Sequence, residues 1–299
     1  MEVPHGAAQL SATAHPLRAA LPLFLLAGLC LSSLDATAKY LVRDHPLLLV
    51  VWARYVGQMA VVTPFAWHRA GPGFWRTRRL RLQLGRSALL LMATIAFFGA
   101  LRYLPLAEGS AVSFLAPIVA VALSWPILRE RATRARITAA VVCFTGILVI
   151  VRPGSAVLHP AVLLLLVTAV TNGLYSLYTR KLRDDSPYAT LFYSALVGAV
   201  GLTIAVPFLL EATTLTLHDG ALLLLTGVLA GLGHGLLTAA YSRAPATLLA
   251  PFTYLQMVWA TLFGYVIFGQ HPDRWSALGM AAIIASGVVL ALWERRRLP

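Results

Sequence analysis

Ten apolar runs of roughly bilayer-spanning length constrain this chain of 299 residues more than any other feature. A helix needs about 20 apolar residues to cross a hydrocarbon core of about 30 Å. Because 59% of the residues are hydrophobic and only 12% are charged, the chain has too little polar surface to enclose its apolar side chains in one soluble globule. The sequence therefore predicts an all-α membrane protein with ten transmembrane helices.

The expected helices divide evenly between the two halves of the chain. They are placed at residues 18–40, 46–67, 87–103, 106–128 and 137–151, and at residues 158–178, 188–210, 221–241, 246–268 and 277–293.

The second half repeats the plan of the first. Residues 87–151 and 221–292 each hold an apolar helix, a short polar break, a helix that contains proline, a charged loop and a third apolar helix. Five crossings per copy is an odd number, so the second copy enters the membrane from the opposite side, and the halves are inverted repeats. We expect a tail at 1–17, one five-helix repeat at 18–152 and a second at 153–299, which ends in a short basic tail.

The basic residues predict the orientation, because cytoplasmic loops of membrane proteins are enriched in Lys and Arg. With the amino terminus inside, the outer segments hold only Lys39, Arg43, Arg102, Arg152 and Arg274, whereas eighteen Lys and Arg residues fall inside and Arg54 lies within a span. Both termini are therefore expected in the cytoplasm.

The net charge of +13 does not indicate nucleic-acid binding, because the arginines lie in short clusters between apolar runs and not on one solvated face. The arginine-rich run 76–86 is expected to be a loop that anchors the protein at anionic lipid headgroups.

Charged residues inside expected spans point to a cavity or a partner. Asp35 and Lys39 are four residues apart on the first helix, so they share a face and can pair, and Arg54 on the second helix is placed to meet Asp35. One interpretation is a structural cluster with Lys39 extending to the headgroups. The other is that Asp35, Lys39, Arg54 and Glu108 gate the protein or couple it to protons. Glu108 also suits the amino end of the fourth helix.

Two expected helices carry a stripe of polar and aromatic side chains at helical spacing. The stripes consist of Thr168, Thr171, Asn172, Tyr175, Tyr178 and Thr179 on one helix, and of Phe252, Gln256, Trp259 and Phe263 on the other, with Tyr254 to one side. Such stripes either hold helices together or line a solute cavity. We favour the cavity, because amides both donate and accept hydrogen bonds and rings stack on planar solutes or face cations.

His234 lies among Gly231, Gly233 and Gly235 on an expected helix. No strand precedes these glycines, so they indicate close helix packing and not a nucleotide-binding loop. His234 is expected either to line the solute path or to be a hydrogen-bonded core residue. The sequence shows no metal cluster and no nucleophile paired with a base, so we expect no enzyme, no metal and no cofactor.

The pattern resembles the ten-helix EamA branch of the drug/metabolite transporter superfamily. The segments that carry the resemblance are 35–41 with Arg54, 97–105, 111–117, Glu130 before Gly146, 191–195, 246–251 and Phe268 before Gly279. Glu130 matches an acid that commonly ends the fourth helix in this family, whereas its counterpart in the second half is Gln270.

Within the branch, the first helix and residues 191–194 look most similar to bacterial uptake proteins for S-adenosylmethionine and riboflavin, and more distantly to amino-acid exporters. The resemblance implies an inner-membrane protein with a central cavity that opens alternately to each side, and it places Ser113 at that cavity.

We therefore expect a secondary transporter of a small organic metabolite, such as an amino acid, S-adenosylmethionine or riboflavin. Its expected partners are the solute and the lipid bilayer, and we expect no binding of nucleic acid. The oligomeric state is expected to be either a monomer or a homodimer. The expected solute-binding residues are Ser113, Asn172, Tyr175, Tyr178, His234, Tyr254, Gln256 and Trp259. The alternative is a non-transporting membrane scaffold or lipid-binding protein, whose polar stripes would pack against each other.

Overall fold

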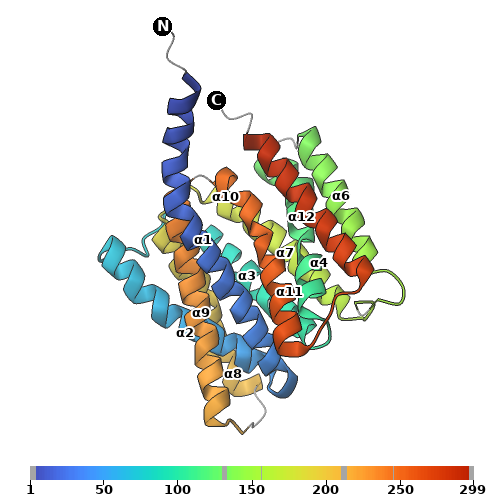
Figure 1. Ribbon diagram of the computed structural model, residues 1–299. Coiled ribbons are helices and arrows are strands. Elements are labelled where there is room, and N and C mark those ends of the chain that lie inside the picture. Colours follow the sequence, from blue (N-terminus) through green and yellow to red (C-terminus); the bar gives the residue numbers. More distant parts are fainter. Residues whose placement is uncertain (1–4, 130–132, 156, 210–213, 245, 296–299) are drawn as a thin grey trace.

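The computed structural model describes residues 5–129, 133–155, 157–209, 214–244 and 246–295, which form twelve α-helices (Figure 1). The first half comprises α1 (His5–Asp44), α2 (Leu47–Ala70), α3 (Leu80–Leu101), α4 (Leu106–Ser113), α5 (Leu115–Leu128) and α6 (Arg134–Ile150). The second half comprises α7 (Val162–Lys181), α8 (Pro187–Leu209), α9 (Leu217–Tyr241), α10 (Ala246–Thr253), α11 (Leu255–Phe268) and α12 (Arg274–Arg295).

The ten expected spans are present, and two of them are interrupted. The fourth span consists of α4 and α5, and the ninth consists of α10 and α11. Pro117 lacks the N–H that would bond to the carbonyl of Ser113, where α4 ends, so the helix breaks at Phe114. Taking α4 and α5 as one span, eight of the described helices are long and apolar enough to cross a membrane; α6 and α11 are shorter.

Helix α1 begins at His5, so the segment before the first expected span is already helical, and the stretch of α1 that is apolar enough to cross a membrane begins at Arg18. One expected boundary is wrong. Helix α3 begins at Leu80 and not at residue 87, so the end of the arginine-rich run belongs to a helix and not to an anchoring loop. Residues 1–4, Glu130 and the last four residues of the basic C-terminal tail lie outside the described residues.

The two halves pack against each other in a symmetric pattern. Helix α1 packs on α9 and, in the same way, α7 packs on α3, so the first helix of each half meets the third helix of the other. The second helices, α2 and α8, pack together, and so do the fifth helices, α6 and α12. Such reciprocal contacts are expected of two copies related by a two-fold axis. Helix α1 begins and α12 ends at the same side of the bundle (Figure 1), as ten crossings require.

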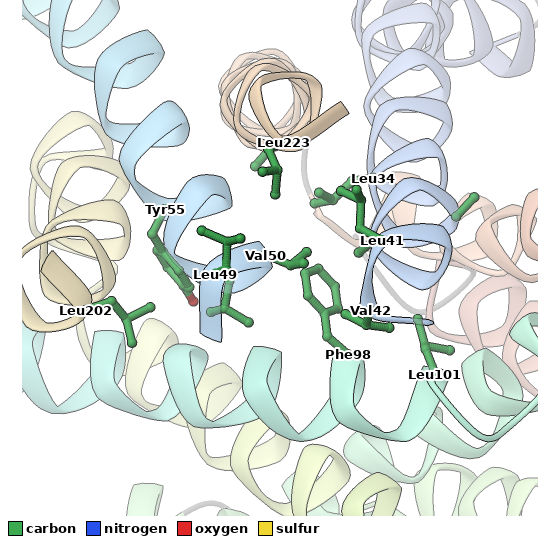
Figure 2. Packing of buried hydrophobic residues seen from close by; sticks show 14 of the residues in the cluster. Leu34, Leu41, Val42, Leu49, Val50, Tyr55, Phe98, Leu101, Leu202 and Leu223 are labelled. Atoms are coloured by element: carbon green, nitrogen blue, oxygen red, sulfur yellow. The ribbon is translucent and has the colours of Figure 1, made fainter. Parts of the chain in front are cut away.

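A buried apolar cluster joins the halves. Figure 2 shows Leu34 and Leu41 of α1, Phe98 of α3, Leu202 of α8 and Leu223 of α9 in this cluster. Beside it, α2 and α9 cross where two glycines face each other.

A Cβ on Gly227 would lie only 2.4 Å from the Cα of Gly57, so neither helix has room for a side chain there. Glycine at such a crossing lets membrane helices approach closely, since lipid provides little hydrophobic drive for their association. Gly146 of α6 and Gly279 of α12 make a second contact of this kind.

Candidate functional site

A cavity of about 740 Å³ lies inside the bundle. Helices α1 to α6 of the first half and α7, α9, α10, α11 and α12 of the second contribute to its wall. This volume lies within the range of roughly 300–1,000 Å³ that is typical of small-molecule sites. The cavity is therefore large enough for a metabolite, and its wall belongs to both halves of the chain.

Most of the side chains expected at a solute site line this cavity. Ser113 of α4, Asn172 and Tyr175 of α7, His234 of α9 and Gln256 of α11 all contribute to the wall. They come from four helices that are far apart in the sequence. Thus one stripe contributes Thr168, Asn172 and Tyr175 to this cavity and the other contributes Gln256. The rings of Phe97, Phe98 and Phe114 complete the aromatic part of the wall.

The other three expected binding residues are not part of the described lining of this cavity. Trp259 lines a smaller adjacent pocket of about 90 Å³, and its indole N–H is buried without a partner. Tyr254 occupies the break between α10 and α11 and stacks on Phe114, with ring centroids 5.1 Å apart. Tyr254 therefore supports the cavity wall from behind. Tyr178 also lies outside the lining.

Asp35 and Arg54 face the cavity from neighbouring helices of the first half. Only 4% of Arg54 is exposed, and its Nε and Nη1 atoms have no hydrogen-bond partner. The two residues interact electrostatically, but no hydrogen bond or salt bridge joins either side chain to another described residue. Asp35 and Arg54 therefore face the same cavity, as predicted, but they form no salt bridge.

The ammonium of Lys39 has partners other than Asp35. Its Nζ donates hydrogen bonds to the carbonyls of Leu101, at 2.8 Å, and Leu104, at 2.5 Å, and lies 5.5 Å from the centroid of the Phe268 ring. Leu101 is the last residue of α3, where a helix leaves carbonyl acceptors without intrahelical donors, and Leu104 lies in the short segment that leads to α4. The suggested pairing with Asp35 is therefore not formed. Because only 2% of Lys39 is exposed, its extension to the lipid headgroups is also wrong.

Further contacts surround Lys39, both within the first half and between the halves. The N–H of Leu106 at the start of α4 donates to Oε1 of Gln270 at 3.1 Å. Glu108 in the first turn of α4 is buried and interacts electrostatically with Lys39. Arg43 lies over the Phe268 ring at 4.7 Å. We call the end of the bundle where these contacts lie the Lys39 end.

Arg152 and Asp273 form a salt bridge of 2.5 Å that links the segments after α6 and before α12. Asp273 also accepts a hydrogen bond of 2.8 Å from the backbone N–H of Ser276. The hydrogen bonds from Ser276 and then Arg152 lower the pKa of the Asp273 carboxyl to about 2.

The opposite end of the cavity is lined by charged residues. Helices α4 and α5 lead away from the Lys39 end, so Arg136 at the start of α6 lies at the far end. Arg180 at the end of α7 lines the cavity as well. The cavity thus extends from Asp35 and Arg54 in the interior to a basic far end.

Arg86, expected in an anchoring loop, is a buried residue of α3. It is 4% exposed and donates to the hydroxyls of Tyr175, Thr179 and Ser194 at 2.5, 2.6 and 2.9 Å, and to the carbonyl of Thr190 at 3.3 Å. Its guanidinium lies 4.3 Å from the Tyr175 ring centroid. Arg86 therefore connects α3 to α7 and α8 and fixes the position of one cavity side chain.

Comparison with known proteins gives matches over nearly the whole chain. A profile described as "EamA-like transporter family" matches residues 18–152 and 159–293. An uncharacterized transporter of Helicobacter pylori is 30% identical, with 90% of this chain and 93% of that protein covered. An S-adenosylmethionine uptake transporter of Rickettsia prowazekii is 28% identical, with 91% and 92% covered.

A riboflavin transporter of Vibrio cholerae is also 28% identical, with 95% of this chain and 96% of that protein covered. One crystal structure shares the fold with a TM-score of 0.64 at 22% identity, and the match covers 96% of this chain and 98% of that one.

Proposed function

Since the chain belongs to the EamA-like transporter family, a family of transporters and not of enzymes, we propose that it moves a small organic metabolite through the central cavity by alternating access. The resemblance found in the sequence is confirmed. The observation that carries the proposal is the cavity of about 740 Å³, whose polar and aromatic wall is built by both halves. A solute bound between two halves can be released to either side when the halves rock against each other.

The asymmetry of the two ends supports this mechanism. At one end, Gln270 binds the start of α4 and the Phe268 ring faces buried Lys39, so the halves are joined there, whereas the cavity reaches Arg136 and Arg180 at the other. In the orientation favoured by the basic residues, with both termini in the cytoplasm, the Lys39 end faces outward. The structure would then correspond to an inward-facing state, and Lys39 and Glu108 would belong to the outer gate.

In the proposed site, Asn172, Tyr175, Gln256, Ser113 and His234 contact the solute. Their side chains offer hydrogen-bond donors, acceptors and one aromatic face on a single cavity. The named relatives indicate two candidate solutes, S-adenosylmethionine and riboflavin.

The test is uptake of radiolabelled S-adenosylmethionine and riboflavin, and of a panel of amino acids, into liposomes that contain the purified protein. Tyr175→Ala and Gln256→Ala should each reduce uptake about 10-fold or more if they lose a contact that binds the solute. Tyr265→Ala is the matched control, because Tyr265 is 55% exposed on α11 and outside the described cavity lining. Uptake that is unchanged in both cavity variants would refute the site. An absence of uptake and efflux over the whole panel would instead favour a scaffold or lipid-binding role.

A further inference from the structure

We infer that the cavity holds a solute with an α-amino acid group, whose carboxylate binds Arg54 and whose ammonium binds Asp35. This inference rests on the proposed function, since it names the class of solute for the same cavity. It goes further in one respect: it gives Asp35 and Arg54 a role in recognition and not only in gating.

Arg54 is buried without a hydrogen-bonding partner among the described residues, and its guanidinium lies 4.3 Å from the centroid of the Tyr55 ring. It is buried in α2, faces the cavity, and has two guanidinium nitrogens without any hydrogen bond. A buried charge without hydrogen-bond partners is costly, so such groups are normally paired. The planar guanidinium fork binds a carboxylate or a phosphate with two parallel hydrogen bonds. Of these two groups, the carboxylate is the one that an α-amino acid brings beside an ammonium, so it is the partner that we assign to Arg54.

Asp35 is the opposite charge on the same wall. Its carboxylate faces the cavity from α1 and has no hydrogen bond to a described residue. Lys39, one helical turn away, is occupied by two backbone carbonyls at and just after the end of α3. Arg54 influences Asp35 electrostatically but forms no salt bridge with it in the described part of the chain. The Asp35 carboxylate is thus free to accept hydrogen bonds from an ammonium.

The two charges select a solute that carries both signs. A zwitterion supplies a partner to each side chain and leaves the net charge of the site unchanged. A solute with a single charge completes one side chain and leaves the other unpaired in a buried site, which is unfavourable. His234, which faces the same cavity and interacts electrostatically with Arg54 and Arg86, adds a further hydrogen-bonding group beside the zwitterion.

The remaining wall suits the rest of such a solute. The rings of Phe97, Phe98, Phe114 and Tyr175 and the amides of Asn172 and Gln256 are all part of it. A cavity of about 740 Å³ is far larger than an α-amino acid group needs, since sites of this size hold drug-sized molecules. The substituent is therefore expected to be large and planar. S-adenosylmethionine meets this description, whereas riboflavin carries neither an ammonium nor a carboxylate.

The inference is tested on the wild-type protein in lipid nanodiscs with two matched solute series. One series is S-adenosylmethionine, its decarboxylated form and its deaminated form, and the other is phenylalanine, phenylethylamine and 3-phenylpropionate. In at least one series the complete α-amino acid should bind about 10-fold or more tightly than both the analogue without the carboxylate and the analogue without the ammonium, as measured by ligand-dependent thermal stabilisation. The sulfonium charge is the same throughout the first series, so each comparison removes only one of the two groups that the inference names. Equal binding of an analogue and its zwitterion in both series would overturn the inference.

Two substitutions test which side chain binds which charged group of the solute. Asp35→Asn should abolish the preference for the ammonium, so that the deaminated analogue binds as well as the zwitterion. Arg54→Gln should abolish the preference for the carboxylate in the same way. Asp184→Asn and Arg183→Gln are the matched controls, because these residues are 69% and 76% exposed outside the described cavity lining, and they should leave both preferences intact. Preferences that survive Asp35→Asn and Arg54→Gln would overturn the assignment. If either variant fails to fold, the two solute series with the wild-type protein still decide.

The outcomes separate this inference from the proposed function. Uptake of riboflavin without binding of either zwitterion would overturn the inference and leave the transporter role standing. An absence of uptake and of thermal stabilisation with every solute would overturn both.

Discussion

Replacing Gly227 with alanine is expected to force α2 and α9 apart. The new Cβ would lie 2.4 Å from the Cα of Gly57 and 2.9 Å from its carbonyl carbon. Non-bonded carbon atoms settle at about 3.5–4.0 Å, so the helices must separate by about 1 Å. Both atoms belong to the backbone, so no side-chain rotation can relieve the contact.

The magnitude follows from two opposing contributions. Inserting a methyl group into a packed interface costs about 1–3 kcal/mol. Alanine favours a helix over glycine by up to about 1 kcal/mol, which offsets part of this cost. We therefore expect Gly227→Ala to lower the free energy of unfolding by about 1–2 kcal/mol.

Gly235→Ala on the same helix is the matched control. A Cβ at Gly235 meets no atom within 4 Å, so only the gain in helix propensity of up to about 1 kcal/mol applies. The free energy of unfolding is measured by titration with a denaturing detergent, for both variants in the same micelles. If Gly227→Ala is as stable as Gly235→Ala, the two halves do not meet at this crossing as described.

Three further predictions concern the contacts around the cavity. Arg86→Lys loses the guanidinium fork that binds α7 and α8, so the free energy of unfolding should fall by about 2 kcal/mol or more. The control Arg81→Lys, at an exposed position, should change the free energy of unfolding by less than about 0.5 kcal/mol. Equal effects of the two substitutions would contradict the role of Arg86. Lys39→Met should lower the free energy of unfolding by at least about 1.5 kcal/mol and should increase thiol labelling of a cysteine placed at the Lys39 end. Arg102→Met, at an exposed position, is the control. Unchanged labelling in Lys39→Met would show that Lys39 does not help to close this end. Asp273, with its pKa lowered to about 2 from an ordinary 3.8, contributes fully above about pH 4 and loses its contribution only as the pH falls through about 2. Melting temperatures of the wild type and Asp273→Asn should therefore differ by the same amount from about pH 5 to pH 8, and a difference that disappears near pH 6 would refute this value.

The helices and their pairing into two halves were predictable because both depend on patterns within the chain. Apolar runs of spanning length define the helices, and the repeated plan defines the halves. Asn172 and Gln256 could be placed at the cavity because helical spacing fixes which side chains share a face. The break at Phe114 follows from Pro117 nearby.

The misplaced residues are those whose surroundings come from distant segments. Arg86 resembles its exposed neighbours in a basic run, and its burial depends on hydroxyls of α7 and α8 that no local pattern reveals. Lys39 has two possible partners, Asp35 on its own helix and the carbonyls at and just after the end of α3, and only the packing of α1 on α3 decides between them. Trp259 shares the helical stripe of Gln256, but it borders the adjacent smaller pocket.

The most direct test of the central claim, a solute cavity shared by the two halves, is thiol labelling from each side of the membrane. Asn172→Cys and Gln256→Cys are made in a protein without Cys30 and Cys143, and a membrane-impermeant reagent is added to sealed vesicles of either orientation. We predict that both cysteines react from the cytoplasmic side and that a transported solute slows the reaction. A cysteine at fully buried Val50 should stay unreactive. If neither Asn172→Cys nor Gln256→Cys reacts from either side, the halves enclose no accessible cavity and the account is contradicted.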